Sequence, residues 1–330
     1  MKLRQFIQLP LVCIGLAAAT AWPLAAQAQT KLRFAHAGPD TSSQHLAALE
    51  FAKNVKERSQ GKLEVQVFPA SQLGNDATVI GAVRGGSIDM MMAGGGNFSG
   101  LNSKFEVLDI PFLFRDREHA YKAVDQQVGQ ELMKALEGSG LKQLAFWEVG
   151  FRSITTKNRA VRTPADVKGL KIRTQPNPVH VAAWKLLGTN PVPMPLSELY
   201  SALESGAVDA QEHPVEITHS AKFYEVQKHL TMTRHAFTAM PVVLNKAKFD
   251  ALAPDLQKVL LDAAQEAKLF QRALNQKNEA AIIADLRKNG MNVIENVDVA
   301  PFKAAMGDEL RKAHIAKNGP ELLAAVEAIK

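Results

Sequence analysis

The stretch Gly169-Leu-Lys-Ile-Arg-Thr174 places an arginine where a strand meets a loop. Leu170 and Ile172 alternate with polar residues, as side chains do along a strand, and the two prolines in residues 174–178 end it. Arg173 therefore lies at a predicted strand end, where open α/β sheets bind ligands. A guanidinium there can hold a carboxylate with two parallel hydrogen bonds. The alternative is a surface arginine paired with a neighbouring acid.

Around this stretch the chain alternates predicted strands and helices, which is typical of an α/β fold with a mostly parallel sheet. Strands are predicted at residues 31–36, 62–68, 88–93, 106–114, 141–147, 170–173, 191–194 and 208–214, and residues 222–234 and 239–246 complete the strand-rich part. Helices are predicted at residues 44–59, 76–84, 116–137, 178–187, 198–204 and 255–289, with a short helical turn at 163–168.

Two helix starts carry capping hydroxyls. Thr41 or Ser42 is predicted to cap the helix at 44–59, and Ser197 the helix at 198–204. The apolar residues of the first of these helices fit one helical face, namely Leu46, Leu49, Phe51, Ala52 and Val55.

Residues 255–289 contain no proline or glycine, and Gly290 supplies a stop. A single helix of this length would span ~52 Å, which is wider than one small lobe. The alternative is two helices with a bend near residues 275–278. We expect one helix that lies across two lobes.

The first 28 residues have the features of an export signal. Lys2 and Arg4 precede an apolar run, and Ala26-Gln-Ala28 is a typical cleavage site. Cys13 is the chain's single cysteine, so the mature protein is predicted to have no disulfide and no thiol chemistry. We expect a periplasmic protein without a membrane anchor.

The net charge of the chain is small and positive. The chain has 39 lysines and arginines against 33 acidic residues, and two of the basic residues belong to the predicted signal. No basic block interleaved with aromatic residues is present, so a nucleic-acid partner is not expected.

Two motifs suggest chemistry that their spacing does not support. Gly94, Gly96 and Gly100 are one residue off a dinucleotide fingerprint, so we interpret the loop as a ligand wall. The second motif, His213-Pro-Val-Glu216-Ile-Thr-His219, matches no zinc-protease spacing. We therefore predict no catalytic residue, no metal and no cofactor, although a periplasmic enzyme acting on organic acids remains an alternative.

A series of ordered motifs resembles the solute receptors of tripartite ATP-independent periplasmic (TRAP) transporters of the DctP type, over nearly the whole mature chain. They are Phe51-Ala-Lys-Asn-Val-Lys-Glu-Arg-Ser-Gln-Gly-Lys62, Phe68-Pro-Ala-Ser-Gln-Leu-Gly74, Asp109-Ile-Pro-Phe-Leu-Phe114, Gly150-Phe-Arg152, Gly169-Leu-Lys-Ile-Arg173, Pro193-Met-Pro-Leu-Ser-Glu-Leu-Tyr200, Gly206-Ala-Val-Asp-Ala-Gln-Glu-His-Pro214 and Lys222-Phe-Tyr-Glu-Val-Gln-Lys228.

The resemblance implies the two-lobed α/β fold of periplasmic binding proteins, with a long helix across the back and a ligand cleft between the lobes. We assign residues 29–150 with 239–278 to lobe I and residues 151–238 with 279–330 to lobe II. The long helix at about 255–289 is shared between them.

The resemblance also implies the ligand and the site. Arg173 would form a salt bridge with the carboxylate of a small organic acid, and Arg152 would add a second charged or hydrogen-bonding contact. Other positions that face the cleft in the family are matched here by Gln44, Asn75, Asn97, Leu196 and His213.

Several positions depart from the family. Many relatives have asparagine in place of His213, and the sialic-acid branch has a glutamate at the position of Gly95 and an aromatic residue at that of Leu196. These differences argue against sialic acid and leave dicarboxylates, oxo or hydroxy acids, sugar acids and cyclic or aromatic acids open. His213 could donate to the ligand and change charge with pH, or it could be bonded within its own lobe.

The expected partners follow from the resemblance. They are the organic acid and a membrane permease with small and large subunits, and we expect a monomer. A ligand sensor for a membrane kinase is the alternative, because it needs the same closure around a ligand.

Overall fold

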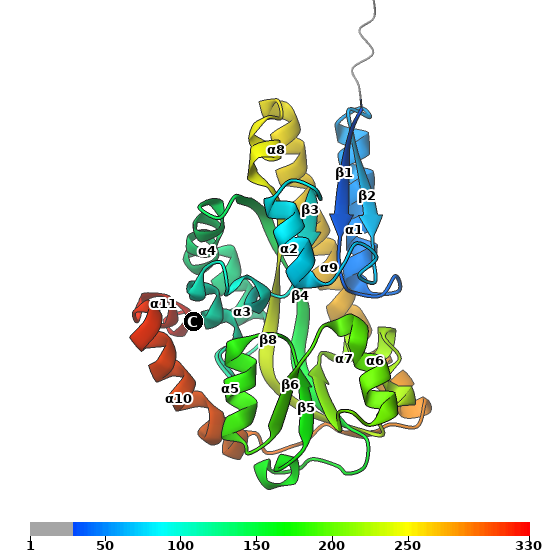
Figure 1. Cartoon of the computed structure of the whole chain (residues 1–330), viewed down its shortest axis with the longest axis vertical. Coiled ribbons are helices and arrows are strands. Elements are labelled where there is room, and N and C mark those ends of the chain that lie inside the picture. The colour runs from blue at the N-terminus through cyan, green and yellow to red at the C-terminus, as the bar shows by residue number, and fades with distance from the viewer. Residues whose placement is uncertain (1–28) are drawn as a thin grey trace, which may run out of the picture.

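The computed structural model describes residues 29–330, so the predicted signal at residues 1–28 lies outside the described part. The described chain is a mixed α/β protein built on one nine-stranded sheet with the order β2-β1-β3-β8-β4-β7-β5-β6, and β9 pairs with β8. One lobe surrounds β1, β2 and β3, and the other surrounds β5, β6 and β7 (Figure 1). The predicted fold class is confirmed.

The first lobe has the predicted strand–helix–strand order. Its elements are β1 (Thr30–Ala35), α1 (Ser43–Arg58), β2 (Leu63–Phe68), α2 (Asp76–Arg84) and β3 (Met90–Met92). β1 runs parallel to both β2 and β3, as expected for strands joined by crossover helices. The Ser42 hydroxyl accepts the His45 N–H at 3.2 Å, so Ser42 is the cap of α1.

The buried face predicted for α1 is partly wrong. Leu46 and Leu49 are 41% and 47% exposed, whereas Ala47 and Ala48 are fully buried together with Phe51. α1 packs closely against a second helix, and alanines allow a closer approach of two backbones than leucines do. The small residues therefore face the core.

The second lobe repeats the alternation of strands and helices. Its elements are β5 (Lys171–Thr174), α5 (Pro178–Leu186), β6 (Asn190–Pro193), α6 (Leu196–Ser205), β7 (Ala210–His213) and α7 (Val215–Ser220). β5 is parallel to β6 and β7. Ser197 is not the cap of α6, because Pro195 is the extended residue that precedes it and the helix begins at Leu196.

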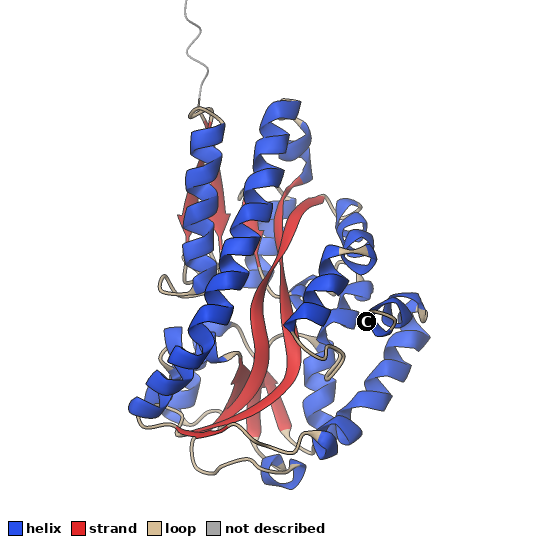
Figure 2. Cartoon of the chain, turned by 180° about the vertical axis from the view of Figure 1, so that it is seen from behind, coloured by secondary structure: helices blue, strands red, loops and turns tan. Residues whose placement is uncertain are grey.

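Two long antiparallel strands, β4 (Leu141–Thr156) and β8 (His229–Asn245), run through both lobes (Figure 2). Shorter, separate strands were predicted for these residues, and that prediction is wrong. Gly150 has a φ of 115° and lies at one of three register shifts between β4 and β8. Such bulges bend a strand without ending its ladder, so the two strands connect the lobes without interruption.

The long helix is confirmed as one element. α9 (Pro254–Lys288) is 35 residues long and has no break at residues 275–278, which settles the alternative of two helices. α9 runs along the back of the molecule beside β4 and β8 (Figure 2). Trp147 of β4 donates its indole N–H to the carbonyl of Ala264 in α9 at 3.1 Å, and this hydrogen bond connects the helix to the sheet.

Two segments between β3 and β4 differ from expectation. The strand predicted at residues 106–114 is a 3-10 helix, Ser103–Asp109, and its consecutive buried side chains show no strand alternation. The helix predicted at 116–137 is two helices, α3 (Arg117–Asp125) and α4 (Gln127–Glu137). A Cβ on Gly129 would lie 1.7 Å from the Val124 carbonyl oxygen, so only glycine permits this sharp turn.

The remaining elements are α8 (Lys246–Asp250), β9 (Asn292–Ile294), α10 (Ala300–Asn318) and α11 (Glu321–Glu327). α10 contacts α5, and α11 returns to pack on α4. The residue boundaries that the sequence predicts for the two lobes remain a proposal.

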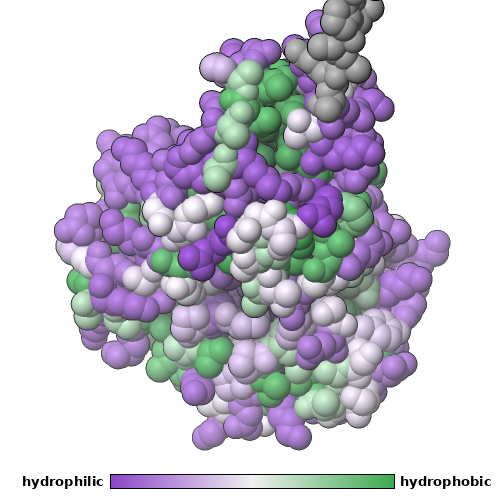
Figure 3. Space-filling view, turned by 45° about the horizontal axis from the view of Figure 1, so that its top comes forward, coloured by the Kyte–Doolittle hydropathy of each residue, from purple (hydrophilic) through white to green (hydrophobic). Residues whose placement is uncertain are grey.

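One face of the molecule has a mainly polar surface. On the face shown in Figure 3, hydrophilic residues dominate and apolar residues form small groups. Among residues 29–330, no helix is long and apolar enough to cross a membrane.

Candidate functional site

A cavity of about 150 Å³ lies between the two lobes. Its walls come from α1, α2 and the loop after β3 on one side, and from β5, α6 and β7 on the other. Every residue predicted from the sequence to bind the ligand lines this cavity: Gln44, Asn75, Asn97, Arg152, Arg173, Leu196 and His213. The fold thus brings the candidate residues together, and their contacts with a ligand remain a proposal.

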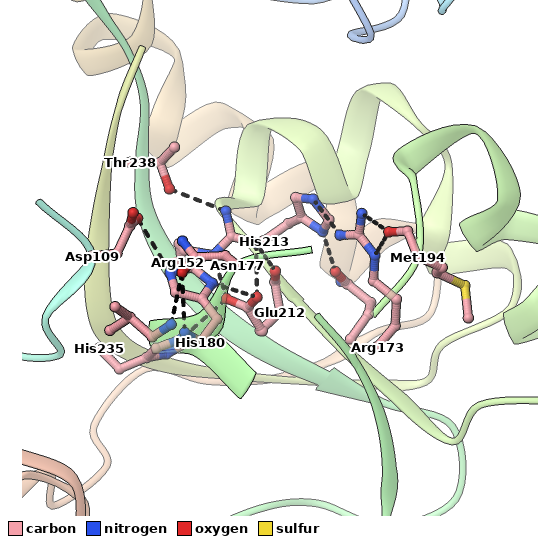
Figure 4. A network of polar contacts seen from close by, with 12 residues as sticks. Asp109, Arg152, Arg173, Asn177, His180, Met194, Glu212, His213, His235 and Thr238 are labelled. Atoms are coloured by element: carbon pink, nitrogen blue, oxygen red, sulfur yellow. Dashed lines mark hydrogen bonds and ion pairs between the residues drawn. The ribbon is translucent and has the colours of Figure 1, made fainter. Parts of the chain in front are cut away.

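Arg173 reaches the cavity from the end of β5 and is only 2% exposed. Its Nε and Nη2 donate to the Met194 carbonyl oxygen at 3.0 and 2.7 Å, and Nη1 donates to His213 Nε2 at 3.2 Å (Figure 4). Each terminal nitrogen keeps a second hydrogen with no partner among residues 29–330, and no carboxylate of these residues forms an ion pair with Arg173. The alternative of a surface arginine paired with an acid is therefore wrong.

The charge of Arg173 is in an unfavourable environment. Burial and the nearby positive charge of Arg152 lower the pKa of Arg173 to about 9, although the more distant carboxylates of Glu212, Asp76 and Glu198 act in the opposite direction. The guanidinium stays charged at neutral pH, but it has lost solvation that its neutral partners Met194 and His213 do not replace. An anion that accepts the remaining hydrogens would stabilise this charge.

His213 is buried and neutral. Its Nδ1 lies within hydrogen-bond distance of Gln211 Oε1, which can only accept, so Nδ1 carries the proton and Nε2 accepts from Arg173. Burial, together with the charges of Arg152 and Arg173, holds the pKa of His213 well below its usual range. The histidine therefore positions Arg173, and its charge does not follow pH near neutrality.

Arg152, in β4, has a carboxylate partner. Its Nε and Nη2 both donate to the Glu212 carboxylate, Nη2 at 2.9 Å from Oε1, and Nη1 donates to Thr238 Oγ1 at 3.1 Å (Figure 4). Both charged side chains are fully buried. Burial would raise the pKa of the Glu212 carboxyl, but the Arg152 charge and His180 hold it well below its usual range. The positive charge of Arg152 is thus neutralised inside the protein.

A buried cluster continues from Glu212. His180 Nδ1 lies 3.3 Å from Glu212 Oε1, and its Nε2 lies 3.3 Å from Asp109 Oδ1. Burial opposes a charge on this ring, but Glu212 and Asp109 raise the pKa of His180 to about 9. His235 Nε2 adds a contact with Glu212 Oε2 at 3.2 Å. We refer to Arg152, Glu212, His180, Asp109 and His235 as the Glu212 cluster.

The other predicted residues have local roles as well as a place in the wall. Asn75 caps α2 by accepting the Thr78 N–H at 3.0 Å. Asn97 donates to the Gly94 carbonyl at 3.2 Å. Leu196 is the first residue of α6.

The wall residues that were missed from the sequence include His36, Asp76 and Gln175. Asp76 is the first residue of α2 and follows the predicted Asn75 directly, and Gln175 comes two residues after Arg173, so proximity to predicted residues could have suggested both. No sequence signal pointed to His36.

The glycine loop at residues 94–100 and the segment at residues 213–219, whose spacings match no cofactor or zinc motif, have other roles. A Cβ on Gly96 would lie 1.9 Å from Asn177 Nδ2, so this glycine permits close packing, while Gly94 lines the cavity. His219 pairs with Asp285 at 2.7 Å, and Glu216 accepts the Ser43 N–H at 3.0 Å. In the part of the chain that the structure describes, no three or more His, Cys, Asp or Glu side chains are placed so that they could hold a metal ion together.

The chain is similar to known solute-binding proteins. Residues 34–317 match the sequence profile of "Bacterial extracellular solute-binding protein, family 7", DctP. The chain is 46% identical, over the full length of both, to the 2,3-diketo-L-gulonate-binding periplasmic protein YiaO of Escherichia coli K12.

Two solved structures are similar over most of the chain. The TRAP periplasmic solute binding protein of Polaromonas sp. JS666, bound to D-erythronate, has a TM-score of 0.89 and 36% identity, covering 92% of this chain and 99% of its own. The TRAP periplasmic solute binding protein of Bordetella bronchiseptica, with density assigned to pantoate, has a TM-score of 0.88 and 34% identity, covering 92% of this chain and all of its own.

Proposed function

This chain belongs to family 7 of the bacterial extracellular solute-binding proteins, the DctP family, and on that premise we propose that it is the extracytoplasmic receptor of a TRAP transporter. It binds a small organic acid between its lobes, with the carboxylate on Arg173, and delivers the acid to a membrane permease. The predicted export signal agrees with this role.

The observation that carries the proposal is the state of Arg173. This guanidinium is buried at the cavity wall, charged, and bonded only to neutral groups of the described chain. Its free hydrogens suit the two oxygens of a carboxylate. When the lobes close on the acid, water leaves and the ion pair strengthens, because the dielectric around it falls.

The relatives support an acid as the ligand. The relative from Escherichia coli is named for diketogulonate, and the Polaromonas protein was solved with erythronate. Each of these molecules carries one carboxylate and several oxygen substituents. A similar acid is therefore the first ligand to test on this chain.

Delivery needs a partner that distinguishes the loaded receptor. Lobe closure around β4 and β8 would change the outer surface when the acid is bound. The permease of small and large subunits that the family resemblance implies would bind this closed form. The receptor itself performs no chemistry on the acid.

A thermal-shift screen over organic acids tests the function. An acid at 100 times its Kd should add about 2.7 kcal/mol to the free energy of unfolding. Mass spectrometry after denaturation should then recover the same acid unaltered. If no carboxylate stabilises the protein, or if the recovered acid is changed, the receptor function is wrong.

A further inference from the structure

We propose that Asp76 is a specificity-determining residue, which makes the cavity accept a polyhydroxylated acid with one carboxylate and reject an acid of the same size with two. The proposal rests on the proposed function, because it needs Arg173 to hold the first carboxylate. Asp76 would add a second determinant of ligand specificity at the opposite wall of the cavity, a carboxylate that repels a second ligand carboxylate.

Asp76 comes from the other lobe than Arg173. It is the first residue of α2, is half-buried and lines the cavity. Its Oδ2 accepts from Asn97 Nδ2 at 3.4 Å, and within residues 29–330 no lysine or arginine forms a salt bridge with it. The only hydrogen-bond partner of this carboxylate in the described chain is therefore neutral, and the Arg173 charge acts on it from a distance without forming a salt bridge.

A charge count of the cavity wall shows why a second carboxylate is disfavoured. The titratable residues that line the cavity are His36, Asp76, Arg152, Arg173 and His213. Glu212 neutralises Arg152, and burial lowers the pKa of His36 to about 3 and that of His213 well below its usual range. Among the lining residues, one positive charge and one negative charge remain.

The first carboxylate of a ligand would take the single free positive charge. A second carboxylate in a cavity of about 150 Å³ would then share a poorly solvated space with Asp76 and find no cation of its own. Like charges in such a space repel strongly, and this kind of repulsion is a common source of specificity.

The same wall offers hydrogen-bond acceptors to hydroxyl groups. Gln44 Oε1 is buried and has no partner in the described chain, and its orientation is set by Nε2, which donates to Glu216 Oε2 at 3.3 Å. Gln175 Oε1 is a further buried acceptor without a partner there. Together with the Asp76 carboxylate, these oxygens need donors. The hydroxyls of a sugar acid supply donors, whereas an ionised dicarboxylate without hydroxyls supplies none.

The test uses pairs of acids that differ only at one end. Erythronate and meso-tartrate form one pair, and galactonate and galactarate form another; in each pair a terminal alcohol is replaced by a carboxylate. Isothermal titration at pH 7.5 would compare the wild type with Asp76→Asn. The matched control is Asp255→Asn, which also removes a carboxylate from the first turn of a helix, α9, away from the cavity.

The wild type should bind one of the two monocarboxylates at least about 30-fold more tightly than its dicarboxylate partner. Asp76→Asn should reduce that ratio at least about tenfold through tighter dicarboxylate binding, and Asp255→Asn should leave it unchanged. Circular dichroism would confirm that both variants are folded.

A pH series gives an independent readout. Burial raises the pKa of Asp76 to about 6, so affinity for the dicarboxylate should rise more steeply between pH 7.5 and 5 in the wild type than in Asp76→Asn. Glu216, behind Gln44, has a pKa raised by burial to about 7 and is present in both proteins, so the variant cancels its contribution.

The outcomes separate this proposal from the proposed function. Equal wild-type affinity for the two members of a pair, or a ratio that Asp76→Asn does not change, overturns the role of Asp76. Binding by the wild type of only those acids that lack hydroxyl groups would also overturn the role of Asp76. In all these cases, loss of binding in Arg173→Met would still support the receptor function, and failure of every acid to bind would overturn both.

Discussion

Arg152 and Arg173 line one cavity and are equally buried, at 0% and 2% exposure, yet their surroundings are opposite. Arg152 is held by the Glu212 carboxylate within the Glu212 cluster, whereas Arg173 contacts only a carbonyl and a neutral imidazole. Burial of a charge is costly unless a partner compensates it. Arg152 has its partner in the folded chain, and we infer that Arg173 receives its partner from the ligand.

The largest expected effect is on the Glu212 cluster. Arg152→Met leaves the buried Glu212 carboxylate with only its longer contacts to His180 and His235, which should lower the free energy of unfolding by about 3–5 kcal/mol. Urea unfolding followed by circular dichroism would measure the loss. A loss below about 1 kcal/mol would mean that the ion pair does not support the fold.

The same substitution at Arg173 should act on binding instead. Arg173→Met should weaken binding of the acid by about 2–5 kcal/mol, mostly through faster release. It should lower the free energy of unfolding without ligand by less than about 1 kcal/mol, or raise it, because it removes a buried charge that has no carboxylate partner in the protein. Isothermal titration and urea unfolding of the same variant would check both. If its losses matched those of Arg152→Met, the contrast between the two arginines would be wrong.

The stability of the Glu212 cluster should depend on pH. The folded pKa of His180 is about 9, above the ordinary value of 6.5, so its proton stabilises the folded state fully below pH 6.5, and this contribution is lost as pH rises through 9. Between pH 6.5 and 8.5 the free energy of unfolding should fall by about 1–3 kcal/mol relative to His180→Gln. Parallel pH profiles of the two proteins would contradict the charged histidine.

A smaller effect is expected at His213. His213→Asn removes the ring nitrogen that accepts from Arg173 and should weaken acid binding by about 0.5–1.5 kcal/mol. Titration at pH 7 and pH 8 should give the same loss, because His213 is neutral at both. A loss as large as that of Arg173→Met would show that His213 itself contacts the ligand.

Helices and strands were predicted well from the sequence where proline or glycine residues mark their ends. Pro and Gly residues bounded α2, β5 and α5 closely, and the absence of both predicted α9 as one helix. The long strands were missed because Gly150 breaks the local pattern, although the hydrogen bonds of β4 and β8 continue past it. Ladder pairing between residues so far apart in the chain leaves no local signal.

The residues of the site were easier to predict than their chemistry. The family resemblance placed both Arg152 and Arg173 in the cleft and predicted that both would contact the ligand. The pairing of Arg152 with Glu212 depends on the antiparallel neighbours β4 and β7, in which Ile154 lies opposite Glu212. Only the three-dimensional register shows that this carboxylate reaches Arg152 and not Arg173.

A crystal structure of the protein with a stabilising acid bound is the most direct measurement. We predict that both oxygens of one ligand carboxylate accept from the terminal nitrogens of Arg173, while Arg152 keeps its contacts with Glu212. A ligand whose carboxylate lies elsewhere, with Arg173 bonded only to Met194 and His213, would contradict the role of Arg173.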